Sequence, residues 1–117
     1  MPELHKLTPA LSILQNQGYK VALVTDGRMS GASGKIPAAI HLSPEAAKGG
    51  VVGKLEDGDM IELDAEKGVL TCLNIDEVDK RNTPDNQIQL SQGVGRELFN
   101  RIRPLVSDSE EGASFII

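Results

Sequence analysis

A short glycine-rich loop gathers most of the side chains in this sequence that could do chemistry. Residues 26–35 read Asp-Gly-Arg-Met-Ser-Gly-Ala-Ser-Gly-Lys. Glycines let a backbone approach a ligand closely and point its N–H groups inward. Ser30 and Ser33 add hydroxyls, and Arg28 and Lys35 add positive charge. The pattern suits either an anion-binding loop or a tight connection without a ligand, because its spacing matches no nucleotide-binding fingerprint.

The charge distribution sets this part of the chain apart. No acidic residue lies between Asp26 and Glu45, whereas Arg28, Lys35 and His41 all lie there, in a chain of 117 residues with a net charge of −5. A cationic window in an acidic protein suits a small anion, although a solvated loop with uncharged neighbours gives the same pattern. The negative net charge argues against nucleic acid and anionic membranes as partners.

The elements around the loop predict an α/β fold with a mixed, barrel-like sheet flanked by helices. The apolar run at residues 19–25 predicts a strand buried on both faces. A helix capped by Thr8, with Pro9 in its first turn, is predicted before this strand. Residues 36–42 form a second apolar stretch, and further strands are predicted at residues 51–55, 60–63 and 69–73. Because α/β proteins tend to bind ligands where strands end, the loop at residues 26–35 is the expected site.

Length and composition predict one domain, residues 1–117, with its own aliphatic core, since the chain has no Trp, one Tyr and two Phe. A last helix is predicted at residues 94–102, and a mobile acidic tail at residues 107–117. No apolar run has the length of a membrane span or signal peptide, so we expect a cytoplasmic protein. The single cysteine, Cys72, excludes an internal disulfide, cannot alone hold a zinc or iron–sulfur site, and is expected in the core.

Three motifs, in order along the chain, resemble the family that joins dihydroxy-acid dehydratase to phosphogluconate dehydratase. They are Val21-Ala22-Leu23-Val24-Thr25-Asp26-Gly27-Arg28-Met29-Ser30-Gly31, His41-Leu42-Ser43-Pro44-Glu45-Ala46 and Leu55-Glu56-Asp57-Gly58-Asp59. Residues 32–41, Ala-Ser-Gly-Lys-Ile-Pro-Ala-Ala-Ile-His, resemble the 6-phosphogluconate branch. The resemblance implies a swivelling β/β/α-type domain at the C-terminal end of a larger enzyme.

The same resemblance implies a hydro-lyase that turns 6-phospho-D-gluconate into 2-dehydro-3-deoxy-6-phospho-D-gluconate in the Entner–Doudoroff pathway. Its cofactors would be an iron–sulfur cluster, held by the missing N-terminal domain, and a divalent metal such as Mg²⁺. The full enzyme would be a homodimer, and this chain alone would be inactive. Two alternatives remain open: a dehydratase of an unphosphorylated sugar acid or dihydroxy acid, and a non-catalytic anion-binding or docking module.

The resemblance also implies roles for individual residues. Ser30 matches a serine that takes the proton from C2, and such a weak base needs metal or cationic stabilisation of its alkoxide. Glu3 matches a carboxylate that helps to ligate magnesium. The candidates for substrate binding are Arg28, Ser33, Gly34, Lys35 and His41, and the three at positions 33–35 are expected to bind phosphate.

Some of these assignments have structural alternatives. Arg28 is equally suited to a structural salt bridge, and His41 lies in an apolar stretch where a histidine is commonly a core residue. Asp26, Gly27 and Gly31 are expected to support the loop.

Overall fold

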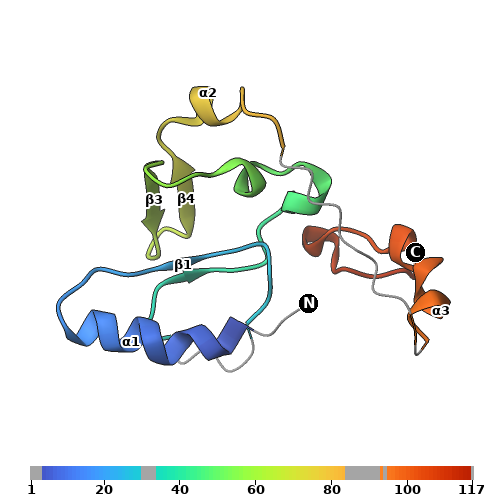
Figure 1. Cartoon of the computed structure of the whole chain (residues 1–117), viewed down its shortest axis with the longest axis horizontal. Helices are drawn as coiled ribbons and strands as arrows, with labels where there is room; N and C mark the ends of the chain where they lie inside the picture. The colour runs from blue at the N-terminus through green and yellow to red at the C-terminus, as the bar shows by residue number, and fades with distance from the viewer. Residues whose placement is uncertain (1–3, 30–33, 84–92, 94, 117) are drawn as a thin grey trace.

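The computed structural model describes residues 4–29, 34–83, 93 and 95–116 (Figure 1). The elements in chain order are the 3-10 helix η1 (Leu4–Leu7), α1 (Thr8–Asn16), β1 (Leu23–Val24), β2 (Ala38–Ala39), η2 (Ala46–Lys48), η3 (Val51–Lys54), β3 (Ile61–Asp64), β4 (Val69–Cys72), α2 (Ile75–Val78), α3 (Arg96–Asn100), η4 (Arg103–Leu105) and η5 (Ser109–Glu111). Within these ranges, no helix has the length and apolar character needed to cross a membrane.

The described strands form two small sheets. β1 and β2 pair in parallel, with Leu23 opposite Ala38, and β3 and β4 form an antiparallel hairpin with Ile61 opposite Cys72. The hairpin turn has Gly68 at φ 67°, as the sequence predicted. In Figure 1 the β1–β2 pair lies between α1 and the hairpin. The barrel-like sheet is not closed by the described residues, so the swivelling β/β/α fold stays a prediction.

Helix α1 lies where the sequence predicts it, but Thr8 does not cap it. The helix continues directly from η1, so Leu7 occupies the capping position and makes no side-chain cap. The Thr8 hydroxyl instead donates to Met29 Sδ at 3.6 Å. Near the other end of the helix, Gln15 Nε2 donates to the backbone oxygen of Lys35 at 3.2 Å. Helix α1 therefore contacts the glycine-rich loop at Met29 and at Lys35.

The strand predicted at residues 51–55 is wrong, because Val51–Lys54 form the 3-10 helix η3. Two glycines allow this tight turn to pack closely. A Cβ at Gly50 would lie 1.8 Å from the Pro44 backbone oxygen, and one at Gly53 would lie 2.9 Å from Ala46 Cβ. Close backbone packing thus overrides the β-propensity of the two valines.

Few apolar side chains are buried among the described residues, and the single domain predicted for residues 1–117 stays a prediction. Only Ile36 and Val78, exposed by 7% and 0%, are buried apolar side chains there. The Cα radius of gyration is 16.2 Å, against about 13 Å for a compact domain of this length. Within the run at residues 19–25, strand β1 covers only Leu23–Val24, and both residues are half-buried. The aliphatic residues therefore leave much of their surface uncovered.

The C-terminal segment contains an ordered turn. Lys48 forms an ion pair with Asp108, and Ser107 N–H donates to the Ser114 backbone oxygen at 2.9 Å. These contacts tie the 3-10 helix η5 to η2 and to the end of the chain. The mobility predicted for residues 107–117 stays a prediction.

Candidate functional site

The site is built at the carboxyl end of β1, where the chain turns into the glycine-rich loop. Gly27 N–H donates to Thr25 Oγ1 at 2.9 Å, which closes a local turn. On the neighbouring segment, Leu42 N–H donates to the Thr25 backbone oxygen at 3.3 Å, and His41 N–H donates to the Gly27 backbone oxygen at 3.0 Å. Beyond the paired residues the register changes at His41, and these two hydrogen bonds hold His41 beside Gly27.

Asp26 joins the loop to the segment that follows His41. Its Oδ2 accepts a hydrogen bond of 2.9 Å from Ala46 N–H, at the start of η2. A carboxylate is a favourable acceptor for an N–H group at a helix start, because the bond is charge-assisted. The contact links two of the three motifs quoted above. It is a bracing contact, although the supporting role of Asp26 in a working enzyme stays a prediction.

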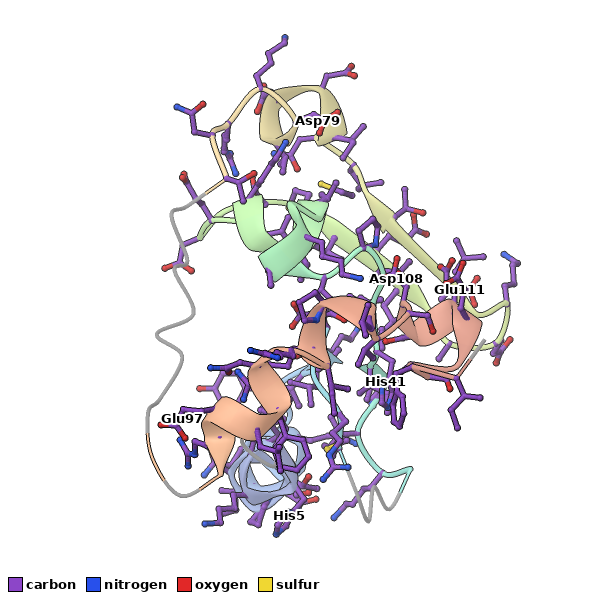
Figure 2. The ribbon with its side chains drawn as sticks, turned by 90° about the vertical axis from the view of Figure 1, so that its right-hand side faces the viewer. His5, His41, Asp79, Glu97, Asp108 and Glu111 are labelled. Atoms are coloured by element: carbon purple, nitrogen blue, oxygen red, sulfur yellow. The ribbon has the colours of Figure 1, made fainter. Side chains whose placement is uncertain are left out.

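His41 is not a core residue in this structure. Its side chain is exposed, and its backbone adopts the left-handed conformation with φ 56°. A non-glycine residue in this region costs about 1–3 kcal/mol and is common at ligand sites. In Figure 2 His41 lies apart from the other histidine, His5, so the two imidazoles form no pair.

Gly34 and Lys35 lie at the opposite end of the β1–β2 sheet. Lys35 shortly precedes Pro37, whose backbone oxygen accepts a hydrogen bond of 2.9 Å from Leu23 N–H at the start of β1. Along α1, the Gln15 contact to Lys35 lies about 10 Å from the Thr8 contact to Met29, at 1.5 Å rise per residue. Both Gly34 and Lys35 are exposed. Gly34 has φ 68°, a conformation that glycine adopts without strain.

The structure therefore divides the predicted site residues into two groups. Asp26, Gly27, Arg28 and His41 share the carboxyl end of the sheet, where Arg28 and His41 are exposed and Gly27 is buried. Gly34 and Lys35 form a separate group beside the end of α1. Four candidates lie outside the described residues: Glu3, Ser30, Gly31 and Ser33.

Sequence reasoning missed a second polar cluster, centred on Asp59. The Asp59 carboxylate accepts from Arg81 Nη2 at 3.0 Å, from Glu56 N–H at 2.8 Å and from Asn74 Nδ2 at 2.8 Å. The Arg81 guanidinium, followed by these other donors, holds the pKa of Asp59 well below its usual range. The cluster joins the Glu56–Asp59 turn to the segments on either side of α2. Its only sequence signal was the acidic motif at residues 55–59, whose arginine partner is remote in sequence.

The residues of this chain cannot hold an iron–sulfur cluster by themselves. Such a cluster takes several cysteine ligands, and Cys72 is the only cysteine in the chain. Cys72 lies in β4, with its thiol 3.5 Å from Asn74 Oδ1. It also lines an apolar cavity of about 330 Å³ together with Val24, Leu42 and Ile61. In the part of the chain that the structure describes, no group of three or more His, Cys, Asp or Glu residues is arranged to hold a metal ion.

Comparison with known proteins identifies the family of this chain. Residues 1–113 match the sequence model of the C-terminal part of dihydroxy-acid and 6-phosphogluconate dehydratases. The chain belongs to the dihydroxy-acid/6-phosphogluconate dehydratase family, which confirms the resemblance noted in the sequence.

Individual relatives refine this assignment. The chain is 54% identical over 114 residues to a phosphogluconate dehydratase of Zymomonas mobilis, covering 97% of this chain and 19% of the relative. It is 56% identical over 119 residues to one of Helicobacter pylori, covering 96% and 19%. It is 40% identical over 108 residues to a dihydroxy-acid dehydratase of Wolinella succinogenes, covering 92% and 19%. The chain thus spans about a fifth of the length of these relatives.

Proposed function

We propose that this chain is the C-terminal, active-site part of a hydro-lyase that dehydrates 6-phospho-D-gluconate to 2-dehydro-3-deoxy-6-phospho-D-gluconate in the Entner–Doudoroff pathway. The observation that carries the proposal is the difference in identity: 54% and 56% to two phosphogluconate dehydratases, but 40% to a dihydroxy-acid dehydratase. The similarity covers nearly the whole chain, including the loop at residues 26–35.

The placement of the described residues on either side of Ser30 supports this reaction. Arg28 and His41, at the carboxyl end of the sheet, would hold the end of the substrate that reacts. Ser30 directly follows Met29 in sequence and, as its alkoxide, would take the proton from C2. The C3–O bond would break, and the serine hydroxyl would return that proton to the departing hydroxyl, which leaves as water. The resulting enol then tautomerises to the 2-keto acid, so atoms and charge balance.

The second group of residues suits the other end of the substrate. Gln15, which contacts Lys35, lies about 10 Å along α1 from Thr8, which contacts Met29. A six-carbon acid with a terminal phosphate has a comparable length, since its single bonds are each about 1.5 Å long. A backbone N–H and an exposed ammonium are suitable donors to a phosphate. Ser33 belongs to the same proposed phosphate site.

The remainder of the proposed enzyme supplies what this chain lacks. The iron–sulfur cluster would be held by the N-terminal part and would assist departure of the hydroxyl.

Within this chain, Glu3 would contribute a ligand to a divalent metal such as Mg²⁺. Asp26, Gly27 and Gly31 would support the loop. The proposal includes a cytoplasmic homodimer, as the family resemblance implies.

An assay of the full-length enzyme tests the proposal. The protein is reconstituted anaerobically with iron, sulfide and Mg²⁺, and kcat/KM is measured for 6-phosphogluconate, gluconate and a branched dihydroxy acid. We expect 6-phosphogluconate to be the preferred substrate. Preference for either of the other two would place the enzyme elsewhere in the family. No turnover of any of them, combined with tight anion binding, would support a non-catalytic module instead.

A further inference from the structure

One edge of strand β1 has no neighbour among the described strands. Leu23 N–H donates to the Pro37 backbone oxygen and Thr25 N–H to that of Ala39, both at 2.9 Å. In a parallel pair, alternate residues of a strand bond to the same neighbour, so the N–H and C=O groups of Val24 point to the opposite edge. The sheet order places no second strand there within the described chain.

Helix α1 has the position of a crossover helix relative to this edge. Its first residue, Thr8, contacts Met29, which follows the carboxyl end of β1. Gln15, one residue before its end, contacts Lys35, which lies towards the amino end of the sheet. The helix therefore runs antiparallel to β1 and delivers the chain to the start of that strand. This is the path of the helix in a strand–helix–strand unit, whose two strands are parallel and lie in one sheet.

The apolar surface indicates that the sheet is incomplete. Parallel sheets are normally covered on both faces, and a two-stranded sheet with two residues in each strand is too small to be stable alone. Val24 nevertheless lines an apolar cavity of about 330 Å³. On the helix, Ile13 and Leu14 are exposed by 58% and 40%. Exposed apolar surface of this kind commonly marks a contact site for additional chain.

We propose that the free edge of β1 is filled by a parallel, apolar strand that precedes α1 in the longer polypeptide. The chain spans about a fifth of its relatives' length, and the matching family model is that of the C-terminal part, so the longer protein can supply such a strand. Its carboxyl end would meet α1 beside Met29. The rest of the enzyme would thereby contact this chain next to the loop at residues 26–35. The inference rests on the proposed function only in that this chain is part of a longer enzyme.

Hydrogen exchange in the full-length enzyme, resolved to single residues by mass spectrometry, tests this inference. Val24 N–H should exchange about 100-fold more slowly than open loop amides, in the same range as Leu23 and Thr25 N–H, because strand hydrogen bonds protect amides. Leu23 and Thr25 are internal controls, since their acceptors lie in this chain. Fast exchange at Val24 alone would overturn the inference. Protection that rises with protein concentration would also overturn it, because the added strand would then come from a second copy.

The same sample separates this inference from the proposed function. An enzyme that dehydrates 6-phosphogluconate while Val24 exchanges freely would refute the added strand and leave the function standing. An enzyme that protects Val24 but turns over none of the tested acids would support the added strand and refute the proposed function.

Discussion

Replacement of Lys35 by alanine tests whether the end of the loop near α1 recognises phosphate. Lys35 is exposed, and its backbone is fixed by the hydrogen bond of 3.2 Å from Gln15. A truncated side chain therefore leaves the backbone contact intact. One charge-assisted contact to phosphate contributes about 1.5–3 kcal/mol, which corresponds to about one to two decades in kcat/KM. Because the side chain is exposed to solvent, we expect the lower half of that range.

The assay compares two substrates in the full-length enzyme. Lys35→Ala should lower kcat/KM for 6-phosphogluconate about tenfold or more and leave the value for gluconate nearly unchanged. Lys35→Arg should keep most of the activity on 6-phosphogluconate, since it retains the charge. Added salt should narrow the gap between Lys35→Ala and the unmodified enzyme, because an exposed charge is screened. Lys67→Ala is a matched control, since Lys67 lies in the β3–β4 turn with 79% of its side chain exposed.

An equal loss on both substrates would refute this reasoning. Lys35 would then be a structural residue, and the phosphate site would have to lie in the rest of the enzyme. Unchanged kcat/KM for both substrates in Lys35→Ala would remove Lys35 from the site altogether.

Four further expectations follow. In the full-length enzyme, Ser30→Ala should lower kcat by about 10²–10⁴ or more and abolish solvent exchange of the C2 proton with cluster content retained; normal exchange would assign the base elsewhere. Residues 1–117 alone should show no turnover and no cluster absorbance after treatment with iron and sulfide, and measurable turnover would contradict the division of the site. His41→Gly should fold normally, because glycine accepts φ 56°, yet raise KM by up to about tenfold; His41→Val should reduce thermal stability instead. The pKa of Asp59 is depressed in the folded state, so the stabilising effect of its carboxylate should be present above about pH 4, the ordinary aspartate pKa, and diminish below it. Urea unfolding of Asp59→Asn and of the unmodified chain, at pH 3 and at pH 7, measures this effect. An equal difference between the two midpoints at both pH values would contradict it.

The sequence predicted the local elements that short-range rules determine. Helix α1, the two strands of the hairpin and the turn at Gly68 follow from periodicity and turn chemistry, and the structure confirms them. It also predicted that the loop would follow a strand. The strand at residues 51–55 was wrong, because the close contact of Gly50 with Pro44 is a tertiary constraint that propensity does not contain.

The arrangement of the site was less predictable than its composition. Sequence spacing put Arg28 and Lys35 in one loop, but it did not reveal that they lie at opposite ends of the sheet. Pairing of β1 with β2 determines that separation, and register depends on contacts distant in sequence. The Asp59–Arg81 pair was missed for the same reason.

The length of the loop follows from the sheet that it joins. Parallel strands cannot be connected by a tight turn, and their crossover takes about a dozen residues or more. Residues 25–37 connect the parallel strands β1 and β2 with about that length and contain no described helix or strand. The connection must therefore travel from the carboxyl end of β1 back to the amino end of β2, and α1 contacts it at Met29 and again at Lys35. In the proposed enzyme, such a connection would carry the base Ser30 directly after Met29 and the phosphate ligand Lys35 towards the amino end of the sheet, a division that suits an extended phosphorylated acid.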